Sequence, residues 1–69
     1  MKLYVIALNG SYANGLIGVT ALRESDAYKL ATAYVVDRAG GELDLTHTVY
    51  TVETTETQAK VVFYQAYIE

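Results

Sequence analysis

The chain has 69 residues, no cysteine, one histidine and a formal net charge of −3. A chain of this length has room for one domain, residues 1–69, and buries only about 60% of the surface that its unfolded form exposes. Disulfides or a structural metal usually reinforce so small a core, and this composition excludes both. We therefore expect no cofactor, and we expect oligomerisation to supply the missing buried surface.

The basic residues are scattered singly among the acids, which argues against duplex nucleic acid as a partner, because phosphate binding needs clustered cations. The apolar start, Met1–Leu8, is cut off by Asn9 and Gly10 before it reaches the length of a signal-peptide core, so we predict a buried strand there. No segment approaches the roughly 20 apolar residues of a membrane span. With no disulfide framework, we expect a cytoplasmic location and no membrane partner.

Two strands are predicted at residues 2–8 and 16–22, which are rich in Val, Ile, Leu and Tyr. The segment between them contains two Asn-Gly pairs, beginning at Asn9 and Asn14. Because Asn-Gly tolerates positive φ, we predict a hairpin with a long, mobile loop.

A helix is predicted from Ser25, which can act as its N-cap, to about Ala39. Asp26 in the first turn and Arg38 in the last turn suit the helix dipole, and the glycine pair that follows is typical of a helix end. One stripe at helical spacing is expected to face the sheet, namely Ala27, Leu30, Ala31, Tyr34 and Val35.

From Leu43 the pattern alternates with a period of two, which predicts a third strand. The apolar phase shifts near Val49 and Tyr50, and we interpret this shift as a β-bulge. A polar turn follows, and residues 61–68 predict a last strand, with a helix beginning near Thr55 as the alternative. The fold class is therefore α+β, with an antiparallel or mixed four-stranded sheet and one helix in the order ββαββ.

The first and last predicted strands are apolar on both faces, although one helix can cover only one face of a sheet. We expect the uncovered face to be an interface, since exposed apolar patches mark interaction sites. The interface candidates are Tyr4, Phe63 and Tyr67. The opposite, helix-facing set of the last strand is then Val62, Tyr64, Ala66 and Ile68. A sheet curled so far that one strand pair covers the other is the alternative.

No constellation of catalytic or metal-binding residues stands out. Gly10 and Gly15 have the spacing of a phosphate loop, but Leu16-Ile17 follows in place of Lys and Ser or Thr. His47 could be a general base or a metal ligand, yet no cysteine or second histidine joins it, and a hydrogen bond to neighbouring threonines is the simpler interpretation. We predict no metal site, no catalytic residues and no enzymatic activity.

The predicted loop supplies a second group of candidates, for contact with a ligand or partner: Asn9, Ser11, Tyr12 and Asn14. An aromatic side chain at a loop tip has no core to fill and can contact a partner or stack on a small molecule. Stacking on single-stranded nucleic acid also needs a positively charged groove, which the sequence lacks.

The chain resembles small uncharacterised proteins of bacteriophages and mobile elements in its start, hairpin, helix start and ending, which are Met1–Ile6, Leu16–Val19, Ser25–Ala27 and Ala66–Glu69. The resemblance carries no functional residues over. It implies action by binding, for example as an inhibitor of a host defence protein or as a sponge for signalling nucleotides. We expect a phage-encoded, homo-oligomeric binding protein in the host cytoplasm with a host protein as partner; the alternative is a small-molecule or nucleotide binder with a pocket at the subunit junction.

Overall fold

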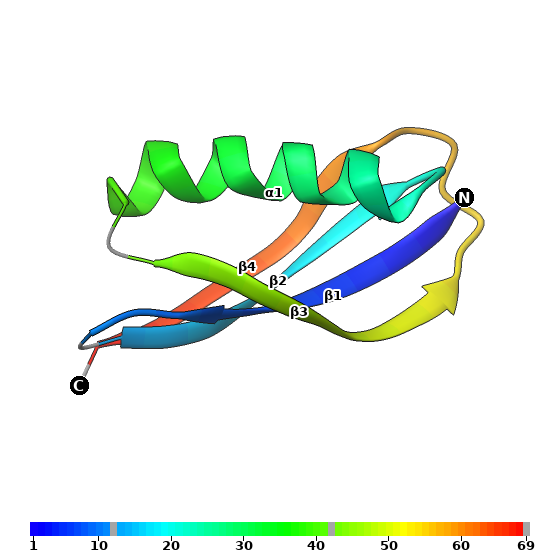
Figure 1. Cartoon of the computed structure of the whole chain (residues 1–69). Coiled ribbons are helices and arrows are strands. Elements are labelled where there is room, and N and C mark those ends of the chain that lie inside the picture. Colours follow the sequence, from blue (N-terminus) through cyan, green and yellow to red (C-terminus); the bar gives the residue numbers. More distant parts are fainter. Residues whose placement is uncertain (12, 42, 69) are drawn as a thin grey trace.

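A computed structural model describes residues 1–11, 13–41 and 43–68. Within them, the chain forms four strands and one helix: β1 (Lys2–Asn9), β2 (Ala13–Ala21), α1 (Glu24–Ala39), β3 (Asp44–Glu53) and β4 (Lys60–Ile68). The strands make an antiparallel sheet of order β3-β1-β2-β4, and α1 lies across one of its faces (Figure 1). The predicted α+β class and ββαββ order are confirmed, and the alternative of a helix near Thr55 is wrong.

The connection between β1 and β2 is shorter than the sequence predicted. The two strands pair as far as Asn9 and Asn14, and the amide of Gly10 donates a hydrogen bond of 2.8 Å to the carbonyl of Ala13. Among the described residues, positive φ is confined to Gly40 and Gly41, so neither Asn-Gly pair adopts it. Gly15 serves a different purpose, because a Cβ there would overlap the carbonyl oxygen of Gln65 on β4.

The N-cap of helix α1 lies two residues earlier than the sequence predicted. Its N-cap is Arg23, whose carbonyl accepts hydrogen bonds of 3.1 Å from the amides of Asp26 and Ala27. The expectation that Ser25 caps the helix is therefore wrong. The predicted end is confirmed: Gly40 adopts the left-handed conformation, with φ 61°, and its amide donates to the carbonyl of Val36.

The core lies between α1 and the face of the sheet that α1 covers. Ala27, Ala31 and Val35 are buried, and their small size lets the helix approach the sheet closely. Each of the larger core side chains contributes about 1.5–3 kcal/mol when it is fully buried. The sheet contributes alternate residues of the central strands: Tyr4, Ile6 and Leu8 from β1 and Ile17, Val19 and Ala21 from β2.

Tyr34 and Tyr64 extend the core toward the β4 edge. Their rings meet edge to face at a centroid distance of 5.4 Å, and the Arg38 guanidinium lies 4.8 Å from the Tyr34 ring centre. Val61, not the predicted Val62, packs with Tyr64 against the core, because the pairing with β2 shifts register between Gly18 and Val19.

Strand β3 pairs with β1 irregularly. Val5 pairs with Tyr50 and Ile6 with Thr48, so Val49 is an extra residue, which confirms the predicted β-bulge. A second register shift follows between Ile6 and Leu8. Because of these shifts, the apolar side chains near the two ends of β3 lie on opposite faces of the sheet, as the change of apolar phase in the sequence indicated.

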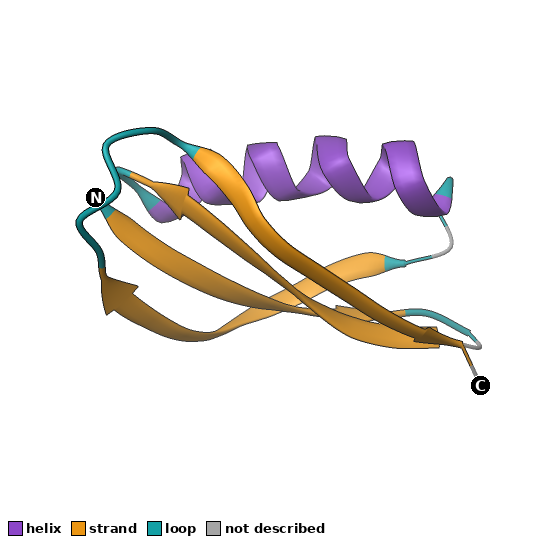
Figure 2. Ribbon diagram, turned by 180° about the vertical axis from the view of Figure 1, so that it is seen from behind, coloured by secondary structure: helices purple, strands orange, loops and turns teal. Residues whose placement is uncertain are grey.

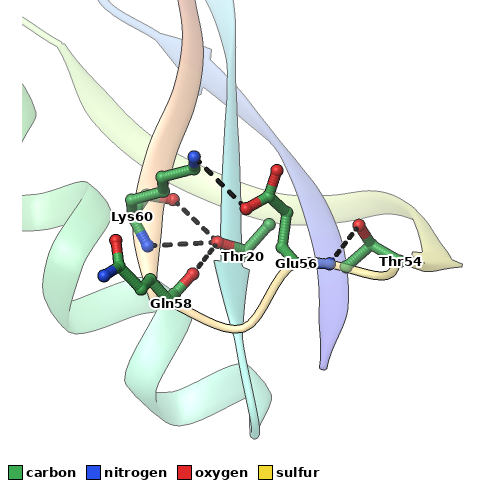
Figure 3. Close-up of polar contacts among 5 residues, drawn as sticks. All are labelled: Thr20, Thr54, Glu56, Gln58 and Lys60. Atoms are coloured by element: carbon green, nitrogen blue, oxygen red, sulfur yellow. Dashed lines mark hydrogen bonds and ion pairs between the residues drawn. The ribbon is translucent and has the colours of Figure 1, made fainter.

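The connection from β3 to β4 crosses the end of the sheet and is anchored by Thr20 (Figure 3). The Thr20 hydroxyl donates to the carbonyl of Gln58 at 2.7 Å and accepts from the amide of Lys60 at 3.1 Å. The ion pair between Lys60 and Glu56, at 3.2 Å, stiffens the same segment. Thr20 is thereby 1% exposed although it lies on the face opposite α1.

Candidate interaction face

The face of the sheet opposite α1 is covered by no helix or loop in either view (Figures 1 and 2). Because side chains alternate along strands and directly paired residues share a face, the strand registers identify its members. We call this surface the open face. Its members are Leu3, Val5, Ala7 and Asn9 of β1, Asn14, Leu16, Gly18 and Thr20 of β2, Asp44, Tyr50 and Val52 of β3, and Lys60, Phe63, Gln65 and Tyr67 of β4.

The middle of the open face is a row that crosses all described strands of the sheet, from Tyr50 through Val5 and Gly18 to Phe63. Val5 is 1% exposed and Gly18 is buried, although no backbone element lies over them. The ring of Phe63 covers Gly18, because a Cβ at that position would lie 2.8 Å from the ring's Cζ. The Phe63 ring therefore covers Gly18 at the centre of the face.

The exposed apolar surface lies at the margins of the open face. Tyr67 is 59% exposed, Tyr50 53% and Val52 46%. Tyr67 donates a hydrogen bond of 3.2 Å to the side-chain carbonyl of Gln65, which fixes the tyrosine ring along β4. The two charged residues among the described members of the open face, Lys60 and Asp44, lie at its opposite ends. Between them the face is uncharged, and depletion of charge with enrichment of Tyr and Phe is the composition of an interface core.

Two of the predicted interface residues, Phe63 and Tyr67, lie on the open face. Tyr4 does not: it faces α1, is 7% exposed and belongs to the core, which corrects its assignment as an interface candidate. The sequence did not single out Tyr50 and Val52. The signal was present in the change of apolar phase near Val49, since the bulge turns these two side chains onto the open face.

The predicted loop candidates are at the hairpin end of the sheet. Asn9 and Asn14 are direct partners on β1 and β2, and they form a cross-strand row with Asp44 on β3 and Tyr67 on β4. Ser11 is exposed in the turn. Tyr12 lies outside the described residues. The structure thus places Asn9 and Asn14 beside an interface candidate.

A groove lies on the helix side of the sheet, between α1 and the start of β3. Its volume is about 470 Å³, and it is lined by Tyr28, Thr32, Val35, Val36, Gly41, Leu43, Asp44 and Leu45. Beyond this groove, Thr48 donates a hydrogen bond of 2.6 Å to the Glu24 carboxylate. The Tyr28 hydroxyl, 3.1 Å from Thr48 Oγ1, must therefore be the donor of that second bond. This chain of bonds ties the start of α1 to β3.

The structure assembles no recognisable catalytic or metal-binding group among the described residues. His47 is exposed, and the Thr46 hydroxyl lies 3.1 Å from its Nδ1, as the simpler interpretation of this histidine predicted. No three described His, Asp or Glu side chains come close enough to hold a metal ion. No helix in the described ranges is long and apolar enough to cross a membrane.

Comparison with known proteins adds no assignment: no protein-family model, curated protein or solved structure matches the chain.

Proposed function

We propose that this chain is a small binding protein without catalytic activity, which associates with a second copy through the open face and acts by occupying the surface of another protein. The observation that carries the proposal is the composition of that face. It is uncharged between Lys60 and Asp44 at its two ends, carries Tyr50, Phe63 and Tyr67, and is left uncovered by α1. Monomeric proteins rarely expose contiguous apolar surface of this kind unless it binds something.

The dimensions of the face suit a second copy. With about 4.8 Å between strands and about 3.3 Å per residue, a sheet of this size presents about 500 Å². Two copies packed face to face therefore bury about 1,000 Å², the area at which specific interfaces begin. Each copy has a net charge of −3, but the charges of the face, Lys60 and Asp44, lie at its two ends, so its apolar middle brings no like charges together.

The identity of the other protein comes from the resemblance alone. We propose a host protein as the target and the host cytoplasm as the site of action, in keeping with a bacteriophage-encoded chain. The alternative, a nucleotide bound at the subunit junction, is less favoured because Asp44 belongs to the polar row of Asn9 and Asn14. A carboxylate there opposes a phosphate group.

Light scattering after size-exclusion chromatography, at micromolar concentration, tests the self-association. We expect a mass at least twice that of the 7.6 kDa chain. Tyr50→Asp should lower this mass, because it places a charge in the packed face. Val36→Asp is the matched control, since Val36 is equally exposed, at 56%, but lies on the helix. A strict monomer, or an oligomer whose mass Tyr50→Asp leaves unchanged, overturns the proposal.

A further inference from the structure

The two edges of the sheet, β3 and β4, differ in how they are protected. Within the described chain, β3 carries Asp44, His47 and Glu53 and two register shifts, which are the devices that prevent an edge strand from pairing with another chain. Strand β4 has neither charge nor proline after Lys60. From Phe63 to Ile68 it pairs with β2 residue for residue. From Phe63 to Ile68 this edge is therefore regularly paired, uncharged and rich in strand-forming residues.

The outer side of β4 has backbone groups without a partner strand. The strand is last in the sheet order and runs along the border of the sheet to the C-terminal end (Figure 2). Val62 and Tyr67, 49% and 59% exposed, show that no other element covers its side chains there. An exposed edge of this composition pairs readily with another strand, so a protein that keeps it must cover it.

We propose that β4 pairs antiparallel with β4 of a second copy, about a two-fold axis perpendicular to the sheet. A second copy is the occupant because an uncharged strand meets no repulsion from itself, and a two-fold contact uses the same surface on both sides. The two sheets become one, in the order β3-β1-β2-β4-β4-β2-β1-β3. This contact is separate from the face-to-face packing of the proposed function, and a chain that makes both assembles as a tetramer.

Symmetry restricts the register of this pairing. An axis perpendicular to the sheet keeps the open faces of both copies on the same side of the joined sheet. Each residue must therefore pair with a residue of the second copy that lies on the same face. The axis must then pass midway between one residue and the same residue of the second copy. An axis at Gln65 places Phe63 opposite Tyr67 of the second copy, and the symmetry repeats this aromatic pair. An axis at Tyr64 or Ala66 forms neither pair, so we assign the axis to Gln65.

The helices leave room for this arrangement. Helix α1 contacts β2 most, with β3 and β4 on either side, so it lies over the middle of the sheet. Joining the sheets edge to edge separates the two helix axes by about four strand spacings, or about 19 Å. A helix with its side chains is about 10–12 Å wide, so the helices do not collide.

Charge exchange at Gln65 tests the register, in the Tyr50→Asp background where the face-to-face contact is removed. Gln65 is exposed, so replacing it does not disturb the core. We expect the background chain to be a dimer, Gln65→Lys and Gln65→Glu each to be monomers, and their equimolar mixture to be a dimer again. Dimers that survive both single replacements overturn the edge contact, whereas a mass insensitive to Tyr50→Asp overturns only the proposed function.

Amide exchange measured residue by residue gives a second readout of the edge contact. In an edge strand, alternate amides point toward the neighbouring strand and the others toward solvent. Edge pairing should protect consecutive amides from Phe63 to Tyr67 in the oligomer, and Gln65→Lys should restore protection of every second one. Protection of every second amide in the unmodified oligomer contradicts the proposal.

Discussion

The ring of Phe63 lies over Gly18, its cross-strand partner, and fills the space that a side chain at position 18 would need. A glycine within a strand leaves a gap in the surface of a sheet, and an aromatic ring on the next strand can cover it. This contact explains how Gly18 is buried on a face that no helix covers. It also holds Phe63 flat at the centre of the open face.

Gly18→Ala should destabilise the protein by about 1–3 kcal/mol, because its methyl group displaces the Phe63 ring. Gly15→Ala should cost more, because its methyl group meets the carbonyl oxygen of Gln65, which is part of the backbone and cannot rotate away. Urea unfolding of both variants measures the two costs. An equal or reversed order would show that Phe63 is not held over Gly18.

The class and order of elements were predictable because each rests on local periodicity. The helix stripe, the glycine end of α1 and the bulge at Val49 all followed from residue spacing within a few turns or strand positions. The predicted hairpin loop was too long because asparagine and glycine favour turns, yet Asn14 and Gly15 lie within β2. There, Gly15 is required by the close approach of β4, which local sequence does not reveal.

An uncovered apolar face could be predicted from the sequence, but the residues that lie on it could not. Strand β1 is apolar on both sides, so alternation could not decide which side meets the helix, and Tyr4 was assigned to the wrong one. The place of Tyr50 and Val52 depends on a register shift against β1, and that of Val61 on a shift against β2. Both are set by pairing between distant segments.

Thr20→Val should destabilise the protein by about 1–3 kcal/mol, because it leaves the carbonyl of Gln58 and the amide of Lys60, whose hydrogen bonds to Thr20 are partly buried, without their hydroxyl partner. Thr54→Val is the matched control, since its hydroxyl accepts an exposed hydrogen bond from Glu56 that water can replace. Urea unfolding compares the two variants, and amide exchange at Lys60 reports the lost bond directly. Similar costs for both would mean that Thr20 does not anchor the connection.

Ala31→Leu should cost about 1–3 kcal/mol of stability, because Ala31 is fully buried where α1 approaches the sheet and extra methyl groups force the two layers apart. Ala33→Leu, two residues along the same helix, is exposed and should change stability by less than about 0.5 kcal/mol. Thermal unfolding followed by circular dichroism compares the pair. A stabilising Ala31→Leu would place the helix farther from the sheet than the structure shows.

Tyr67→Asp should dissociate the assembly completely, because Tyr67 takes part in both proposed contacts: it lies on the open face and opposite Phe63 of a second copy across the β4 edge. The side chain is 59% exposed in the single chain, so folding should be preserved. Leu22→Asp is the control, since Leu22 is 72% exposed but lies in the turn between β2 and α1. Light scattering should give the monomer mass for Tyr67→Asp and the unmodified mass for Leu22→Asp. If Tyr67→Asp instead halves the mass of a tetramer, Tyr67 contributes to one of the two contacts, and the Gln65 charge exchange then identifies which one remains.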